Sequence, residues 1–122
     1  MTPSPDNPLC FELPYPPSLN RYYRHVGAKI LISREGRAYR AAIAPLVRLA
    51  HCGTLAGRLG LRLDFHPPDK RRRDLDNLNK ALWDAMCKCG LYGDDSQIKE
   101  FHSTMQEPKI GGSVKVQIWE MD

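Results

Sequence analysis

A strict alternation of apolar and other residues marks one segment in the middle of this chain. Its apolar members are Leu59, Leu61, Leu63 and Phe65. Side chains alternate between the two faces of a β-strand, so this spacing predicts a strand over 59–66 with one face turned toward a hydrophobic core. Pro67-Pro68 should end the strand, because proline lacks the backbone donor that a β-ladder needs.

A helix is predicted beyond the loop 69–73 that follows this strand. It is expected to begin near Leu75 or Asp76 and to end at Gly90. Its apolar positions recur every three or four residues and are Leu75, Leu78, Leu82, Ala85, Met86 and Cys89. Asp76, Lys80 and Asp84 form a stripe along the other side. One face should therefore pack on the sheet while the other meets solvent or a ligand.

A second amphipathic helix is predicted upstream, with Ser33 as its N-cap and an end near His51. Its apolar arc consists of Ala38, Tyr39, Ala42, Ile43, Leu46, Val47, Leu49 and Ala50. The complementary arc carries Arg34, Arg37, Arg40 and Arg48. Such a stripe serves either as a solubilising face or as a contact for a polyanion, and its single sign of charge favours the polyanion.

The remaining elements complete one domain. Residues 1–8 are predicted to be a disordered lead, and 9–122 to be the folded domain. Strands are expected at 9–13 and 29–32, and a hairpin at 97–106 and 113–120 around Gly111-Gly112. Val114, Val116 and Ile118 should point inward. This order of elements predicts an α/β (α+β) fold in which both helices pack against one sheet.

The charge distribution favours an anionic partner. The 122 residues include 18 Lys and Arg against 14 Asp and Glu, for a formal charge of +4. Between Asn20 and Ala50, Glu35 is the single acid among many basic residues. Arg21-Tyr-Tyr-Arg-His25 also interleaves cations with rings, as single-strand-binding surfaces do, although a packed tyrosine with solvated arginines fits equally well. No apolar run is long enough for a membrane span or a signal peptide, so a cytoplasmic protein is expected.

The cysteines and histidines do not suggest a zinc site. Cys87 and Cys89 would project about 200° apart on a helix and could not chelate one ion together. All four cysteines are expected to be free thiols. The four histidines are scattered, and each is expected to be solvated or to cap an element.

Carboxylates and basic side chains occur together around the predicted helix that begins near Leu75. The basic run Lys70 to Arg73 leads directly into Asp74 and Asp76, and a second acidic pair, Asp94 and Asp95, follows the helix. The basic side chains would attract a polyanion, whereas the carboxylates would repel it. A divalent cation bound to the carboxylates would remove this repulsion. Mg²⁺ and Mn²⁺ prefer such oxygen ligands. The spacing thus predicts a metal site, with the Asp94-Asp95 turn completing it and Lys80 placed to meet a phosphate oxygen.

Each of these features also has a purely structural interpretation. Aspartate is a favoured N-cap. Asp76, Lys80 and Asp84 have the i, i+4 spacing of a salt-bridge ladder. Gly93-Asp-Asp-Ser is ordinary turn chemistry.

Three motifs resemble the RusA-type Holliday junction resolvases, small phage and prophage endonucleases. They are Pro14-Tyr-Pro-Pro-Ser-Leu-Asn-Arg-Tyr-Tyr-Arg-His25, Asp69-Lys-Arg-Arg-Arg-Asp-Leu-Asp-Asn-Leu-Asn-Lys80 and Gly93-Asp-Asp95. The resemblance runs from about Phe11 to Glu120. It implies a homodimer with a mixed sheet and two main helices that cuts four-way DNA junctions with Mg²⁺ or Mn²⁺. It also implies essential acids at Asp74, Asp76 and Asp95, a catalytic lysine at Lys80 and a contributing basic residue at Arg73.

The resulting prediction is a metal-dependent endodeoxyribonuclease that resolves Holliday junctions by paired, symmetric nicks. Asp74, Asp76 and Asp95 would hold the metal, with Asp94 as a further candidate, and the metal would activate water for in-line attack. The candidate DNA-binding residues are Lys70, Arg71, Arg72, Arg73, Arg21, Arg24, Arg34, Arg37 and Arg40. No organic cofactor is expected. Two alternatives stay open: a non-catalytic basic nucleic-acid-binding module, and a metal-dependent hydrolase of small nucleotides.

Overall fold

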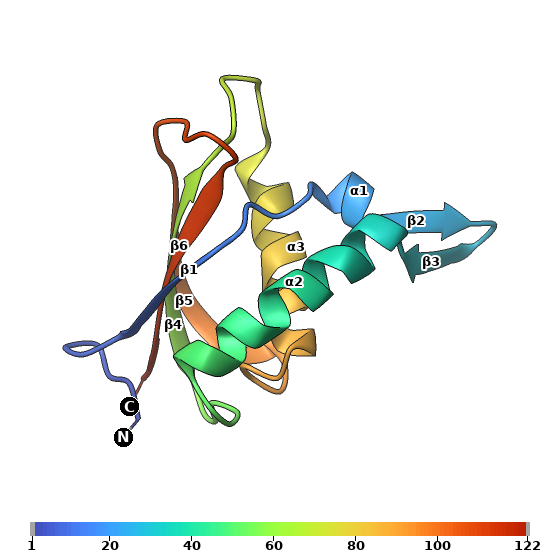
Figure 1. The fold of residues 1–122 in the computed structure, drawn as a ribbon. Helices are drawn as coiled ribbons and strands as arrows, with labels where there is room; N and C mark the ends of the chain where they lie inside the picture. Colours follow the sequence, from blue (N-terminus) through green and yellow to red (C-terminus); the bar gives the residue numbers. More distant parts are fainter. Residues whose placement is uncertain (1, 122) are drawn as a thin grey trace.

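A four-stranded mixed sheet forms the body of the protein, in a computed structural model that describes residues 2–121 (Figure 1). The strands lie in the order β1-β6-β4-β5. Their bounds are Leu9–Leu13 for β1, Leu59–His66 for β4, Ile98–Met105 for β5 and Ser113–Glu120 for β6. β4 runs parallel to β5 and antiparallel to β6, which in turn pairs antiparallel with β1. The expected α+β class with a mixed sheet is confirmed.

Two long helices cover one face of this sheet (Figure 1). They are α2 (Arg34–Ala50) and α3 (Leu75–Lys88). A one-turn helix α1 (Leu19–Tyr22) and a two-stranded hairpin of β2 (Tyr23–Val26) and β3 (Lys29–Ile32) precede α2. A short 3-10 helix η1 (Asp95–Gln97) leads into β5.

The alternation in β4 produces the core. Leu59, Leu61, Leu63 and Phe65 are each fully buried beneath the helices. The same face of β6 buries Val114, Val116 and Ile118, as predicted. On the opposite face the Trp119 indole packs against Gly60 and occupies the space that a Cβ atom would need. Glycine is therefore required at this position of the central strand.

The predicted hairpin between the last two strands is wrong. β5 and β6 do not pair, because β4 lies between them. The glycines 111 and 112 do adopt positive φ values, of 80° and 71°, and turn the chain. However, the connection 106–112 spans two strand spacings of about 4.8 Å each, so β6 reaches the far side of β4. The backbone amide of Gln106 donates to the carbonyl of Phe65, and this hydrogen bond ties the connection to the end of β4.

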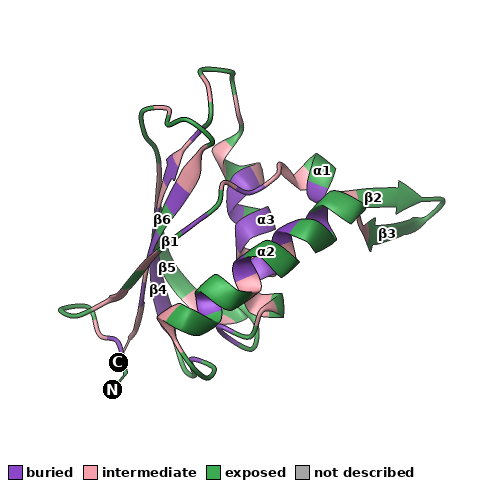
Figure 2. Ribbon diagram, viewed as in Figure 1, coloured by how far each residue is buried: buried purple, intermediate pink, exposed green. Residues whose placement is uncertain are grey.

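Both long helices form as predicted, although the apolar face of α2 is narrower than expected. The Ser33 hydroxyl caps α2 by accepting from the Gly36 amide at 2.9 Å. Figure 2 shows buried residues along only one line of this helix, where Tyr39, Ile43 and Val47 meet the core. Leu49, which the predicted arc includes, is 88% exposed. A helix at the edge of a two-layer domain buries only the stripe that its neighbours can reach.

The N-terminal lead, for which the sequence predicts disorder, is described from Thr2 on. Ser4 and Asn7 exchange backbone hydrogen bonds around a turn, and the Pro3 carbonyl accepts from the Glu120 amide at 3.0 Å. Met1 lies outside the described residues. Within residues 2–121 no helix is both long and apolar enough to cross a membrane. The four cysteines are free thiols, as predicted.

Candidate active site

The loop that connects β4 to α3 is held together by an arginine–aspartate pair. The Arg73 guanidinium contacts Asp69 Oδ1 at 2.8 Å and donates to the carbonyls of Asp69 and Arg71. The hydrogen bond from Arg73 to the Asp69 carboxylate, together with the bond from the Arg71 amide, lowers the pKa of Asp69 to about 2. Arg73 also lies over the Tyr15 ring, 5.7 Å from its centroid. Arg73, which the resemblance marks as a contributing basic residue, thus fixes the shape of this loop.

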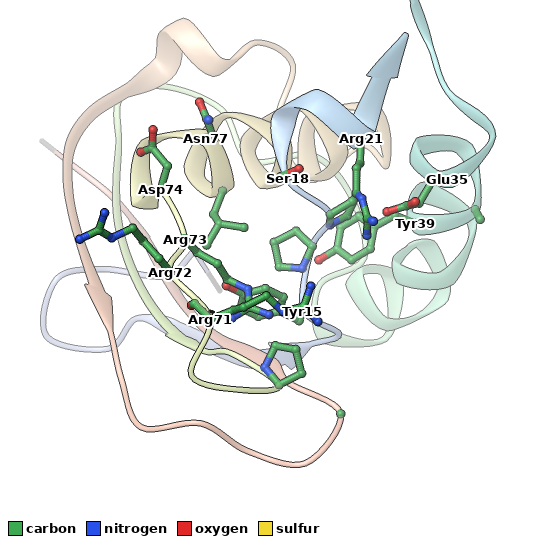
Figure 3. Close-up of a pocket in the computed structure, with 16 residues that line it drawn as sticks. Tyr15, Ser18, Arg21, Glu35, Tyr39, Arg71, Arg72, Arg73, Asp74 and Asn77 are labelled. Carbon is green, nitrogen blue, oxygen red and sulfur yellow. Dashed lines mark hydrogen bonds between the residues drawn. The ribbon is translucent and has the colours of Figure 1, made fainter.

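The same loop forms one wall of an open cleft of about 770 Å³ (Figure 3). Arg71, Arg72 and Asp74 line this wall, while Arg21 and Glu35 lie on the opposite side. Lys70, Arg71 and Arg72 are exposed, so three of the four cations in the basic run remain open to a ligand. A cleft with cations on both walls attracts a phosphate backbone.

Asp74 and Asp76 lie where α3 begins, and Asp74 lines this cleft. Asp74 is the N-cap of α3, and its Oδ1 accepts from the Asp76 amide at 3.0 Å. Both aspartates are exposed, and no ion pair within residues 2–121 involves either carboxylate. The N-cap interpretation is therefore correct for Asp74. Its second oxygen and the whole Asp76 carboxylate remain available to bind a cation.

The salt-bridge ladder along α3 does not form. Lys80 is exposed one turn beyond Asp76, yet it makes no ion pair with any described residue. Asp84 instead turns toward the other helices, where its Oδ2 contacts Arg40 of α2 at 2.7 Å. The same oxygen accepts from the hydroxyl of Tyr22 at the end of α1. Lys80 is thus a cation without an ion pair among the described residues, one helical turn beyond the Asp76 carboxylate.

The second acidic pair lies on a turn that several hydrogen bonds hold in place. Asp94 caps η1 by accepting from the Ser96 amide at 2.9 Å, and this backbone bond lowers the pKa of Asp94. The Gln97 side chain accepts from the amides of Gly93 and Asp94 and donates to the carbonyls of Leu55 and Gly57. Asp94 is therefore occupied as a cap, and Asp95 projects from the turn.

Asp95 has an unfavourable electrostatic environment. Partial burial raises its pKa, and the negative charges of Asp94 and Asp84 raise it further. The turn that carries Asp95 lies at the last turn of α3, where the Cys87 thiol donates to the Gly93 carbonyl at 3.5 Å. A carboxylate that the fold destabilises in this way is a candidate for binding a cation or for proton transfer.

The predicted three-aspartate centre is not assembled within one protomer. Asp74 precedes the first turn of α3, whereas the turn that carries Asp95 contacts Cys87 in the last turn of this 14-residue helix, which is about 21 Å long. Figure 1 shows the orange segment that contains η1 next to the opposite end of α3 from the loop at its start. Accordingly, no group of three or more Asp, Glu, His or Cys side chains within residues 2–121 could hold one metal ion. Within residues 2–121 of one chain, the 93–96 turn therefore does not lie at the Asp74–Asp76 end of α3.

Most of the candidate DNA-binding arginines that precede the cleft loop in the sequence are exposed, but one of them is held in an ion pair. Arg21, Arg24, Arg34 and Arg37 are exposed, and Arg37 reaches back to the Ile32 carbonyl at 3.2 Å. Arg40 is half-buried in its ion pair with Asp84. Tyr22 is buried, and Tyr23 packs edge-on against it with ring centroids 4.8 Å apart. The tyrosines therefore pack, whereas most of the arginines face solvent.

Sequence patterns did not indicate several residues that line the cleft, among them Tyr15, Asn77 and Glu35. Tyr15 follows the proline that ends β1, and its hydroxyl is buried without a hydrogen-bond partner. The Pro14-Tyr-Pro-Pro run indicated a rigid loop, but no local pattern reveals which surface such a loop lines.

Comparison with known proteins gives consistent matches. The family model described as "Endodeoxyribonuclease RusA" matches residues 14–119. The chain is 41% identical over 116 residues to a protein of Escherichia coli strain K12 named "Crossover junction endodeoxyribonuclease RusA", covering 94% of this chain and 97% of that protein. It is 43% identical over 117 residues to the protein of the same name from Enterobacteria phage 82, with the same coverage of both. Each match includes the loop, the cleft and both acidic pairs.

Proposed function

The chain belongs to the RusA endodeoxyribonuclease family, and from this premise we propose that it cuts four-way DNA junctions by hydrolysing phosphodiester bonds. One observation supports this most directly: the exposed carboxylate of Asp74 lines the same cleft as the exposed cations Arg71 and Arg72, and the exposed carboxylate of Asp76 follows two residues later in the first turn of α3. Cations of this kind bind the DNA backbone, while carboxylates serve its hydrolysis.

Each residue around the cleft then has a distinct role. Arg71 and Arg72 contact phosphates on either side of the cut, and the loop that Arg73 braces against Asp69 fixes their positions. The Lys80 ammonium, which no carboxylate neutralises, stabilises the negative charge that develops on the phosphoryl oxygens or on the leaving oxygen. A group that acts mainly in the transition state in this way raises the cleavage rate more than the affinity.

Asp74 and Asp76 suit a hard divalent cation, Mg²⁺ or Mn²⁺, better than any other type of ligand. Both offer carboxylate oxygens that are open to solvent, and neither His nor Cys lies among the residues that line the cleft. When bound, such a cation supplies an activated water and neutralises charge at the phosphate. Hydrolysis needs no organic cofactor. Because the substrate is DNA, the cytoplasmic location predicted from the sequence fits this activity, with the protein on the nucleoid when it is bound.

The separation of the two acidic pairs leads us to propose a homodimer. β5 is the outermost strand beyond β4, so its outer edge is unpaired, and Phe101 and Met105 on it are 47% and 38% exposed. β5 starts just after Asp95 and runs toward the end of the sheet that carries Asp74. A second copy paired antiparallel along this edge would place the partner subunit's Asp95 near Asp74 and Asp76. A junction with two-fold symmetry also needs two sites.

Complementation between two inactive variants tests this arrangement. Asp76→Asn and Asp95→Asn homodimers should each fail to cut a supercoiled plasmid that carries a cruciform. If each site uses acids from both subunits, the mixed dimer has one site with both substitutions and one with neither. Mixing the variants should then restore nicking of one strand and give open circles. Two variants that stay inactive when mixed would place the acids within one protomer, and a protein that sediments as a monomer would exclude the dimer.

A cleavage assay separates the proposed function from its alternatives. Purified protein is incubated with a four-way junction, a fork and a linear duplex, with Mg²⁺ and with a chelator. A junction resolvase cuts the four-way junction symmetrically and only with the metal. Binding without cleavage of any DNA would indicate the non-catalytic module. Hydrolysis of mononucleotides, with weak dependence of binding on salt, would indicate the hydrolase of small nucleotides.

A further inference from the structure

The β2–β3 hairpin forms an arm that projects from the body of the protein (Figure 1). Its two strands pair only with each other, in register from Tyr23 opposite Ile32 to Val26 opposite Lys29. Every residue from Arg24 to Leu31 is exposed (Figure 2). A two-stranded hairpin without a packed face is at best marginally stable in water. The rest of the protein must therefore hold this arm at its base.

The base of the arm is clamped to both long helices. Tyr22, which precedes β2, is fully buried and donates to Asp84 of α3. Ser33, which follows β3, donates to the Tyr22 carbonyl through its amide and its hydroxyl, both at 2.9 Å. At the first turn of α2, a Cβ on Gly36 would approach the same carbonyl to 2.4 Å, so only glycine fits there. These contacts fix the direction in which the arm points.

The tip combines apolar and basic side chains. Val26 is 48% exposed, and Ile30 is 62% exposed. Arg24 and Lys29 lie on the same short ribbon, and no acidic residue occurs from Asn20 to Arg34. The cations favour an anionic partner. The exposed apolar side chains favour a partner surface that buries them away from water. The apolar surface of an intact duplex is limited to thymine methyl groups in the major groove, whereas unstacked base pairs expose the broad faces of the bases.

We propose that this arm enters the centre of the four-way junction, where Val26 and Ile30 contact unstacked bases and Arg24 and Lys29 contact the converging phosphates. The proposal rests on the junction-cutting function given above. The arm would hold the crossover open and so favour the geometry in which the strands can be cut. Pairing of two such arms between subunits is disfavoured, because both carry only positive charge.

The variant Val26→Thr/Ile30→Thr tests the role of the apolar tip. Threonine keeps the β-branched shape and the strand preference of both residues while making the tip polar. Leu49→Thr is the matched control, because Leu49 is an exposed apolar residue at the far end of α2 from the arm. Binding is followed with a junction that carries 2-aminopurine at the crossover, in an Asp76→Asn background that leaves the DNA uncut. Cleavage is measured without that substitution.

The arm variant should bind the junction within about threefold of wild type, because its cations remain. It should lose most of the rise in 2-aminopurine fluorescence that reports unstacking at the crossover. Its cleavage of an intact junction should fall about tenfold or more, whereas a junction nicked at the crossover, whose centre opens freely, should be cut within about twofold of the wild-type rate. The Leu49→Thr control should match wild type in all three measurements.

Wild-type fluorescence and cleavage in the arm variant would overturn the proposal. So would dissociation of the variant into monomers, which would make a second copy the partner of the arm. If wild type and the Leu49→Thr control also fail to cut any junction, the proposed function itself fails, and this outcome differs from a defect confined to the arm variant. Should the double variant not fold, Ile30→Thr alone provides the same test, with the melting temperature as the check on folding.

Discussion

The hydroxyl of Tyr22 donates a hydrogen bond to the carboxylate of Asp84, across 62 positions of the chain. Arg40 contacts the same oxygen, so one carboxylate joins α1, α2 and α3. This contact anchors the base of the β2–β3 arm and leaves Lys80 without an acidic partner on α3. The contact therefore stabilises the packing of the three helices and also leaves the Lys80 ammonium available for the proposed chemistry.

Replacing Tyr22 with phenylalanine should destabilise the protein by about 1–2 kcal/mol, because Asp84 and Arg40 each lose a half-buried hydrogen bond. Urea unfolding followed by circular dichroism measures this loss. Tyr15→Phe is the control, since the Tyr15 hydroxyl is buried without a partner and its removal should cost nothing. Equal stabilities of the Tyr22→Phe and Tyr15→Phe variants would contradict the bonding seen here.

Two substitutions at Asp74 separate its role as a cap from its role in the proposed chemistry. Asparagine is as good an N-cap as aspartate, so Asp74→Asn should keep the melting temperature and abolish cleavage. Asp74→Ala should abolish cleavage as well and should also cost about 1 kcal/mol of stability. Thermal melts and a junction cleavage assay check both expectations. An active, fully stable Asp74→Asn protein would limit Asp74 to capping.

Lys80→Ala should lower the cleavage rate by about 100-fold with little change in affinity for the junction, the pattern of a group that acts in the transition state. Its melting temperature should not change, because Lys80 makes no ion pair within residues 2–121. Lys88→Ala, at the exposed end of the same helix, is the control and should cut normally. If Lys80 belonged to a salt-bridge ladder, its loss would instead cost about 0.5 kcal/mol of stability and no activity.

Asp95→Asn should slightly stabilise the protein at neutral pH, because the fold raises the pKa of Asp95 through partial burial and repulsion from Asp94 and Asp84. A raised pKa means that folding favours the protonated acid, so the ionised form costs stability above that pKa. The gain should be about 0.5 kcal/mol or less, since water screens this exposed group. It should shrink as the pH falls through the raised pKa and vanish below about 3.9, the value for an unfolded aspartate. Melts from about pH 3 to about pH 8 would show a pH-independent difference if this interpretation were wrong.

Arg71→Ala/Arg72→Ala should weaken binding to every junction sequence alike. The plot of log affinity against log salt concentration should flatten by up to about two units, because two phosphate contacts no longer release counterions. Lys115→Ala removes an exposed cation from β6 and is the control for net charge. An unchanged slope in the double variant would mean that Arg71 and Arg72 face only solvent.

Local patterns in the sequence predicted the main elements of the fold correctly. The alternation in 59–66, the apolar repeat in 75–88 and the Ser33 cap each depend on residues within a few positions of one another, so they can be read directly along the chain. The short strand β2 was missed because its residues carry no apolar alternation, and it forms only because β3 pairs with it. The motifs around Asp74 and Asp95 indicated the family for the same reason, since each is a contiguous run of residues.

The tertiary structure alone decided how these pieces meet. β5 pairs with β4 and not with β6, although the glycines between β5 and β6 are typical of a hairpin turn. The turn that carries Asp95 then lies at the opposite end of α3 from Asp74, and no group of three such acids within residues 2–121 could hold one metal ion. Asp84 likewise forms its ion pair with Arg40 of α2 and not with Lys80, its neighbour on α3. These pairings are decided by competition among contacts between residues that are far apart in the chain. The free energies of such contacts depend on burial and on pairing in the folded state, and the local spacing of residues in the sequence contains no information about either.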